Sequence, residues 1–253
     1  MMIAERLEHW AKKQEKRTAL QVKRGESYDK TTYGDLWKRS LGVACLLRSS
    51  GAKPGDRVAL FAGNSPEWVM AYFGIHLAGC VVVPIDAQYG NKEIETLVRF
   101  SEARAVILDR DREAVLAQIS PELKGSLFLF SLDADAAYPY VFAQEAPADF
   151  QPWKHSPDDL MSIIFTSGTT GEPKGVQLTC GNISSNVEGI LKAVRLNKKD
   201  NILNFLPLHH AYASTAGAFS PLAGGGTVTF SHSLKGTDLL ATTRETGVSI
   251  FMG

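Results

Sequence analysis

Residues 166–175, TSGTTGEPKG, carry the residue types best suited to binding a charged ligand. Three glycines, four hydroxyl side chains and one lysine fall within ten residues. Glycine lets the backbone adopt positive φ angles and turn its N–H groups toward a ligand. Hydroxyl groups donate hydrogen bonds to phosphate oxygens, and lysine adds a compact positive charge. This composition predicts a loop that wraps a polyphosphate. The candidate binding residues are Thr166, Ser167, Gly168, Thr169, Thr170, Gly171 and Lys174.

Apolar runs flank this loop, at residues 163–165 before it and, with alternating polarity, at residues 176–178 after it. Both runs favour strands, so we expect a strand–loop–strand hairpin. A Walker loop needs a lysine directly after its second glycine, whereas two residues separate Gly171 from Lys174. A dinucleotide fingerprint opens a helix, whereas a strand follows here. On composition alone, an ordinary exposed hairpin loop is the alternative.

The exact order of the residues in this loop, beyond its composition, favours a phosphate-binding loop over an ordinary exposed one. Residues 166–176, TSGTTGEPKGV, resemble almost letter for letter the phosphate-loop signature of the acyl-adenylate-forming (AMP-binding) enzymes. That superfamily includes acyl-CoA synthetases, adenylation domains of nonribosomal peptide synthetases and beetle luciferases. The resemblance implies that backbone N–H groups around Gly168 and Gly171 hold the β- and γ-phosphates of ATP, and that Lys174 offsets their charge. It gives the same role to the hydroxyls of Thr166, Ser167, Thr169 and Thr170.

A second motif, Pro-Leu-His-His at residues 207–210, resembles the Pro-Leu-x-His segment of the same family, with His210 in the place of its histidine. The resemblance implies that this segment lines the acyl pocket and touches the adenylate. We expect the strand that begins at Ile202 to continue into the motif, so that His209 and His210 point to opposite faces and share no metal. A histidine satisfied at a strand end is the alternative. Ala213 stands where the family usually has glycine.

Composition limits the partners of the 253-residue chain. Lys plus Arg and Asp plus Glu both number 27, so a net charge near zero gives no electrostatic case for nucleic acid. Three scattered cysteines form neither a disulfide framework nor a zinc spacing, and Cys80 and Cys180 are expected to pack as small apolar residues. The charged N-terminus lacks a signal-peptide core, and the longest apolar stretch, residues 71–85, is too short to span a bilayer. We therefore expect a cytoplasmic protein without a transmembrane segment.

Strands and helices alternate with short connections along the first 110 residues. This alternation predicts an α/β fold, layered with mostly parallel sheets. It resembles the N-terminal part of the large domain of the acyl-adenylate-forming enzymes. We expect a first α/β subdomain at residues 1–155, and the hairpin with the start of a second subdomain at residues 156–253. The expected buried strands include residues 57–61, 80–84 and 105–108.

The end of the chain predicts a truncated protein. Residues 250–253 read as a buried strand, whereas domain boundaries usually fall in polar, flexible segments. Later family motifs are missing: Tyr-Gly-x-Thr-Glu for ATP and magnesium, Tyr-x-x-Gly-Asp for the ribose, and a C-terminal lid domain with its catalytic lysine. We expect a fragment that is inactive alone, with no catalytic residue assigned and His210 a candidate for the acyl and adenylate pocket. Surface exposed by truncation offers a route to association.

The resemblance implies an ATP-dependent ligase that activates a fatty or aryl carboxylic acid as acyl-AMP and passes it to coenzyme A. ATP, coenzyme A and a small carboxylate are then the partners, with Mg²⁺ held by a ligand beyond this chain. The alternatives are a non-catalytic nucleotide-binding or scaffold fragment and the adenylation domain of a peptide synthetase. A simple ATPase, which would release phosphate without a carboxylate, is a further alternative.

Overall fold

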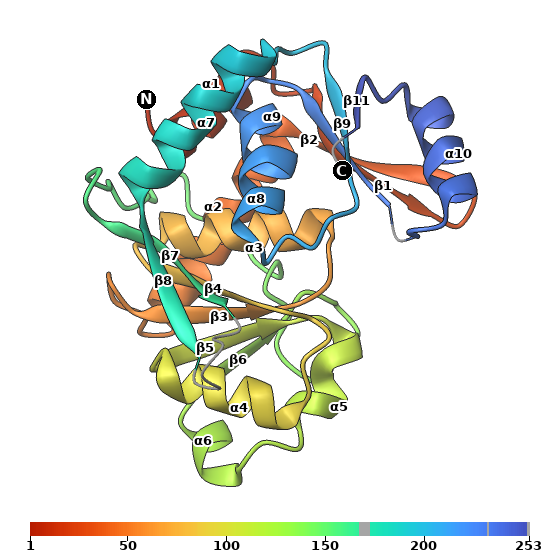
Figure 1. Cartoon of the computed structure of the whole chain (residues 1–253). Coiled ribbons are helices and arrows are strands. Elements are labelled where there is room, and N and C mark those ends of the chain that lie inside the picture. The colour runs from red at the N-terminus through yellow and green to blue at the C-terminus, as the bar shows by residue number, and fades with distance from the viewer. Residues whose placement is uncertain (167–172, 232, 252–253) are drawn as a thin grey trace. The chain divides into compact units, whose positions relative to one another are not determined.

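The computed structural model describes residues 1–166, 173–231 and 233–251 (Figure 1). The described chain is α/β, with two separate and mostly parallel sheets, as the alternating pattern predicted. Packing divides it into two compact units. The first comprises Met1–Trp37, Asn64–Val69 and Gly181–Gly253, and the second comprises Lys38–Gly63 and Met70–Cys180. The subdomain boundary expected between residues 155 and 156 stays a prediction.

Helices connect most of the strands in the described part of the chain (Figure 1). Among the described residues, none of these helices has both the length and the apolar character needed to cross a membrane. The α-helices are α1 (Ile3–Lys13), α2 (Tyr33–Ser49), α3 (Pro66–Leu77), α4 (Asn91–Phe100), α5 (Glu113–Leu116), α6 (Pro121–Gly125), α7 (Cys180–Val194), α8 (Ala211–Ser214), α9 (Ser220–Ala223) and α10 (Gly236–Thr246).

The second unit contains a six-stranded sheet of order β6-β5-β3-β4-β7-β8. All its neighbouring strands run parallel except the edge pair β7–β8, which is an antiparallel hairpin. Strand β4 is apolar throughout, and β3 is apolar after Arg57, as expected for strands whose two faces are both buried in a parallel sheet. The strands are β3 (Arg57–Phe61), β4 (Val81–Ile85), β5 (Ala103–Leu108), β6 (Phe128–Ser131), β7 (Leu160–Thr166) and β8 (Lys174–Thr179).

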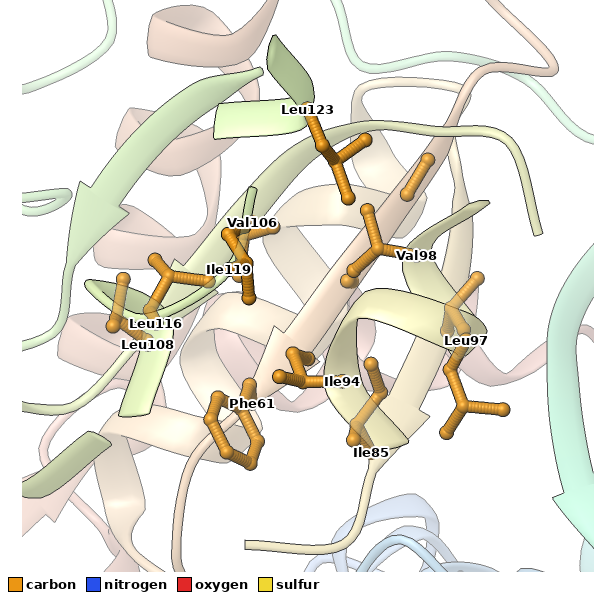
Figure 2. Close-up of a cluster of buried hydrophobic side chains, with 13 residues drawn as sticks. Phe61, Ile85, Ile94, Leu97, Val98, Val106, Leu108, Leu116, Ile119 and Leu123 are labelled. Carbon is orange, nitrogen blue, oxygen red and sulfur yellow. The ribbon is translucent and has the colours of Figure 1, made fainter. Parts of the chain in front are cut away.

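A hydrophobic core lies between this sheet and α4 (Figure 2). Phe61 and Ile85, at the ends of β3 and β4, contribute to the same cluster as Ile94 on the buried face of α4. The apolar residues of α4 recur at helical spacing, which places them on one face. Ile163 and Phe165 of β7 pack against this core, so the strand that leads into the predicted phosphate loop is held by the interior of the unit.

The first unit contains a five-stranded sheet of order β11-β9-β10-β1-β2. It is parallel except for the edge hairpin β1–β2. A buried polar chain crosses its centre: Gln21 Nε2 donates to Thr229 Oγ1 at 2.8 Å, and Thr229 Oγ1 donates to Asn201 Oδ1 at 2.8 Å. The strands are β1 (Thr18–Arg24), β2 (Ser27–Thr32), β9 (Asn201–Asn204), β10 (Thr227–Phe230) and β11 (Ile250–Phe251).

Helix α1 packs on α9, and the segment that joins α8 to α9 packs on β9. That joining segment, Thr215–Phe219, is a π-helical turn. Together the three pieces form one continuous helical run from Ala211 to Ala223. Tyr33 is fixed beneath this run because its buried hydroxyl bonds to the carbonyl oxygens of Gly226 at 2.7 Å and Leu222 at 3.1 Å.

Candidate nucleotide-binding site

The β7–β8 hairpin forms where the sequence predicted it. Thr166 ends β7, Lys174 begins β8, and the two residues are register partners across the hairpin. Both are exposed. The predicted phosphate ligands between them lie outside the described residues; they are Ser167, Gly168, Thr169, Thr170 and Gly171.

The body of the hairpin is tied to the sheet. Ser162 pairs with Val82 of β4, and its hydroxyl donates to the Val82 carbonyl oxygen at 3.0 Å. Phe165 packs edge-on against Phe100 of α4, with ring centroids 5.8 Å apart. The sequence therefore builds a stem that is held to the sheet and ends at the register pair Thr166 and Lys174.

Gly175 is required by the packing of the stem. It is the register partner of Phe165. A Cβ atom at Gly175 would lie 2.9 Å from Ile163 Cγ2 and 3.3 Å from Phe165 Cε1. Since Ile163 is β-branched, its Cγ2 atom has little freedom to move away. The glycine that follows Lys174 thus allows two core-facing side chains of β7 to lie over β8.

Lys174 has no described carboxylate partner: the ion pairs formed by residues 1–166, 173–231 and 233–251 do not include it. A lysine beside a hydroxyl at the mouth of a glycine-rich loop suits phosphate oxygens. That these residues hold the triphosphate of ATP stays a prediction.

The Pro-Leu-His-His motif lies in the first unit, after β9. His210 is exposed, as the residue before α8, and its carbonyl oxygen accepts hydrogen bonds from the Ser214 N–H and hydroxyl, both at 3.0 Å. The prediction that the strand continues through the motif is wrong, because β9 ends at Asn204. A turn follows, and the rings of His209 and His210 tilt against each other with centroids 4.1 Å apart rather than pointing to opposite faces.

Asn64 is the residue that sequence reasoning missed, and it explains why the strand stops. Its Nδ2 donates to the Leu206 carbonyl oxygen at 2.7 Å, and its Oδ1 accepts the Leu208 N–H at 2.9 Å. These bonds replace ladder bonds and turn the chain. The sequence signal was a polar residue placed between the end of a buried strand and the cap of the next helix.

Ala213 is buried directly after this turn, and Asn204 Nδ2 reaches its carbonyl oxygen at 3.5 Å. The π-helical turn begins two residues later, where the Ser220 hydroxyl donates to the Thr215 carbonyl oxygen at 2.8 Å. Single π-helical turns within helices are frequent at functional sites. The segment that the resemblance assigns to the acyl pocket therefore carries an irregular helix close after His210.

The described residues offer no set of oxygen ligands for Mg²⁺. Among them, one group of three possible metal ligands lies close together, and it consists of two histidines and a cysteine. Mg²⁺ prefers carboxylate, phosphate and water oxygens in octahedral geometry. That the magnesium ligand lies beyond this chain stays a prediction.

Comparison with known proteins assigns the family. The model of the AMP-binding enzyme family matches residues 7–253. Oxalate–CoA ligase from Arabidopsis thaliana is 30% identical over 226 residues, which cover 88% of this chain and 44% of that protein. Tyrocidine synthase 3 from Brevibacillus parabrevis is 33% identical over 196 residues, covering 78% of this chain and 3% of that protein.

Among solved structures, ATP-bound MatB from Rhodopseudomonas palustris aligns with a TM-score of 0.86 and 25% identity. The alignment covers 100% of this chain and 49% of MatB. The chain thus spans less than half the length of the two curated relatives named above. The phosphate-loop signature, the α/β fold and the family match agree, and the chain belongs to the AMP-binding enzyme family.

Proposed function

We propose that this chain is the ATP-binding part of an acid–thiol ligase that forms acyl-CoA. The observation that carries the proposal is the exposed pair Thr166 and Lys174, which are register partners at the two ends of the TSGTTGEPKG loop. In a chain of the AMP-binding enzyme family, this pair frames a site for the triphosphate. The CoA ligases among its relatives support coenzyme A as the acceptor.

The reaction has two transfers. An oxygen of the carboxylate attacks the α-phosphorus of ATP, the bond to pyrophosphate breaks, and acyl-AMP forms. The coenzyme A sulfur then attacks the acyl carbon, AMP leaves with the bonding electrons, and the thiol proton passes to solvent. Phosphoryl and acyl transfers of this kind need alignment and charge neutralisation rather than a protein nucleophile. Lys174 offsets phosphate charge, and the loop hydroxyls orient the β- and γ-phosphates.

His210 and the helical run after it form one wall of the acyl site in this proposal. Three small residues, Ala211, Ala213 and Ala216, follow His210 in the sequence, and Ala213 and Ala216 are buried. Small side chains leave space for an aryl or alkyl group. The acid is therefore a fatty or aryl carboxylate.

We place the reaction in the cytosol, because free thiols such as that of Cys45 are kept reduced there.

ATP binding by the chain tests the first step. We expect Lys174→Ala to weaken ATP binding at least about tenfold, because a charge-assisted hydrogen bond contributes about 1.5–3 kcal/mol. Lys30→Ala, which removes an exposed strand lysine from the other sheet, should leave the affinity unchanged. Equilibrium dialysis with labelled ATP gives both values. Equal affinities for wild type and Lys174→Ala would contradict the proposed site.

Carboxylate-dependent exchange of pyrophosphate into ATP tests the reaction in the protein extended to family length. We expect exchange that depends on a fatty or aryl acid and that is lost in Lys174→Ala. Phosphate release without a carboxylate would indicate a simple ATPase instead. Exchange by the 253-residue chain alone would contradict our expectation that this chain is inactive by itself.

An adenylation domain that loads a carrier protein is the second candidate. The similarity to tyrocidine synthase 3 favours it, since that relative has the higher identity of the two curated proteins compared above. Both candidates form the same acyl-AMP, so only the second transfer separates them. Trapping of the acyl group on free coenzyme A supports the ligase, and trapping only on a carrier phosphopantetheine thiol supports the adenylation domain.

A further inference from the structure

Two buried histidines and a buried cysteine meet at the base of the β7–β8 hairpin. His76 lies in the last turn of α3, His155 lies in the segment before β7, and Cys180 begins α7. One ligand atom from each residue lies within 4.8 Å of the other two. All three residues belong to the second unit. Their spacing in the sequence gave no sign of this cluster, because 79 residues separate the two histidines.

Two buried ring nitrogens of this cluster, His76 Nδ1 and His155 Nδ1, form no hydrogen bond, and one of them, His155 Nδ1, has Asp159 Oδ2 at 3.5 Å. Buried polar atoms are nearly always hydrogen-bonded, and leaving one unsatisfied costs about 1–3 kcal/mol. The imidazole rings are stacked, with centroids 3.8 Å apart and planes at 12°.

The hydrogen bond at the other nitrogen of His155 fixes which atom can bind a ligand. Its Nε2 lies 2.7 Å from the His76 carbonyl oxygen. A carbonyl only accepts, so Nε2 carries the proton and donates it, and the lone pair of the neutral ring is left on Nδ1. A histidine that ligates a metal typically donates its second nitrogen to a carbonyl or carboxylate in this way.

We propose that His76, His155 and Cys180 bind a zinc ion. Two imidazole nitrogens and a thiolate match the ligands that Zn²⁺ prefers and do not suit Mg²⁺ or Ca²⁺. Binding forms two Zn–N bonds and one Zn–S bond, and the Cys180 thiol proton passes to solvent. Zn–N distances of about 2.0–2.1 Å and Zn–S of about 2.3 Å place tetrahedral donors about 3.3–3.6 Å apart. The donor atoms lie within 4.8 Å of one another, so they need to close by up to about 1.5 Å. Because imidazole lone pairs lie in the ring plane, the two stacked rings also need to rotate out of their parallel arrangement to bind one ion.

Asp159 is placed to complete the shell. Its Oδ2 lies 3.5 Å from His155 Nδ1, and its backbone carbonyl oxygen accepts the Cys180 N–H at 2.9 Å. A carboxylate oxygen is a common fourth zinc ligand, and a water molecule is the alternative. Asp159 is also bound by Ser156, whose N–H and hydroxyl donate to it at 2.9 Å each. The acidic residue is therefore held beside the cluster before any ion arrives.

The position of the cluster gives the ion a structural role. His155 and Asp159 precede β7, and Cys180 follows β8. The ion would therefore lie at the end of the hairpin opposite its loop. Register pairs run from Leu160 with Thr179 at this end to Thr166 with Lys174 at the other. Six strand residues at about 3.3 Å each separate the two ends by about 20 Å. The zinc ion would thus fasten the hairpin to α3 without contacting the phosphates.

Zinc titration of the chelator-treated chain tests this site. We expect one equivalent of Zn²⁺ to bind, with at least tenfold weaker affinity in Cys180→Ser. Cys80→Ser is the matched control, since Cys80 is also buried in the second unit but lies outside the cluster. Co²⁺ bound in place of Zn²⁺ should give a thiolate-to-metal charge-transfer band in wild type and Cys80→Ser, and not in Cys180→Ser. Equal binding and equal bands in all three proteins would overturn the proposal, as would no binding by wild type.

A measurement without variants covers the case in which Cys180→Ser does not fold. X-ray absorption at the zinc edge of the loaded wild-type chain should show two nitrogen neighbours and one sulfur neighbour. A shell of only nitrogen and oxygen neighbours would refute the site. When the same fraction of the protein is folded, removal of zinc should not change the affinity for ATP. The zinc proposal can therefore fail while the proposed ligase function stands.

Discussion

Asn64 holds Leu208 in a turn that the local sequence does not encode. Asn64 Oδ1 accepts the Leu208 N–H at 2.9 Å, while its Nδ2 donates to the Leu206 carbonyl oxygen at 2.7 Å and to Asn204 Oδ1 at 3.1 Å. One side chain therefore satisfies backbone groups on both sides of Pro207. The conformation of the segment before His210 depends on this amide.

We predict that Asn64→Ala lowers the free energy of unfolding by about 1–3 kcal/mol, because the Leu208 N–H and Leu206 carbonyl lose their partner. Asn64→Asp should not restore the stability. Its carboxylate can still accept the Leu208 N–H, but it places a second oxygen against the Leu206 carbonyl oxygen. Asn186→Ala, an exposed change within α7, is the control and should be nearly neutral. Urea denaturation measures all three, and equal values for Asn64→Ala and the control would contradict this account.

Two glycine-to-alanine changes should alter the stability of the folded chain in opposite directions. A Cβ atom at Gly175 meets Ile163 Cγ2 at 2.9 Å, so Gly175→Ala should destabilise the chain by about 1–3 kcal/mol through overpacking. At Gly189, in α7, a Cβ atom meets nothing within 4 Å. Gly189→Ala should stabilise by about 0.5–1 kcal/mol because alanine has the higher helix propensity. Thermal unfolding of both variants checks the signs, and a neutral Gly175→Ala would show that β7 can shift.

Asp109 should give the chain a pH-dependent contribution to stability whose sign is set by its burial. Its carboxylate accepts the Gly63 N–H at 2.8 Å and pairs with Arg112 at 3.1 Å, yet burial raises its pKa above the ordinary value. The folded state therefore holds the proton more tightly than the unfolded state does. Between the ordinary pKa near 3.9 and the raised folded pKa, this residue's contribution to stability falls as pH rises.

The difference in unfolding free energy between wild type and Asp109→Asn isolates that contribution. We expect wild type to lose stability relative to Asp109→Asn as pH rises through this window, and the difference to become constant above it. Denaturant melts from pH 3.5 to about 7 follow the change. A difference that grows in favour of wild type with rising pH would mean that Arg112 and Gly63 outweigh burial.

Local sequence patterns were enough to predict the strands that consist of short apolar runs. β3 lies at Arg57–Phe61 as predicted, and β4 at Val81–Ile85 lies within one residue of its predicted position. Apolar β-branched runs between helical segments specify buried parallel strands whatever their partners. The hairpin around the glycine-rich loop was found for the same reason, since its stem alternates and its loop cannot continue a strand.

Long-range contacts decided what the sequence did not show. β9 stops at Asn204 because Asn64, from a distant part of the chain, takes over the hydrogen bonds of the next residues. β1 pairs with β10, which places Leu20 beside Val228 across more than 200 residues. The histidine–cysteine cluster arises in the same way, so cysteine spacing alone gave no zinc motif.

Thr229 tests how much the buried polar chain of the five-stranded sheet contributes. Its hydroxyl accepts from Gln21 and donates to Asn201, both at 2.8 Å, and it is fully buried. Thr229→Val keeps the shape and β propensity but leaves two buried amide groups each without a bond, so we expect a loss of about 2–4 kcal/mol. Thr31→Val on the edge strand β2 should change stability by less than about 0.5 kcal/mol. Replacing Gln21 by Leu in the Thr229→Val background should recover part of the loss, because the change removes one unpaired amide; further destabilisation would show that Gln21 contributes through packing instead.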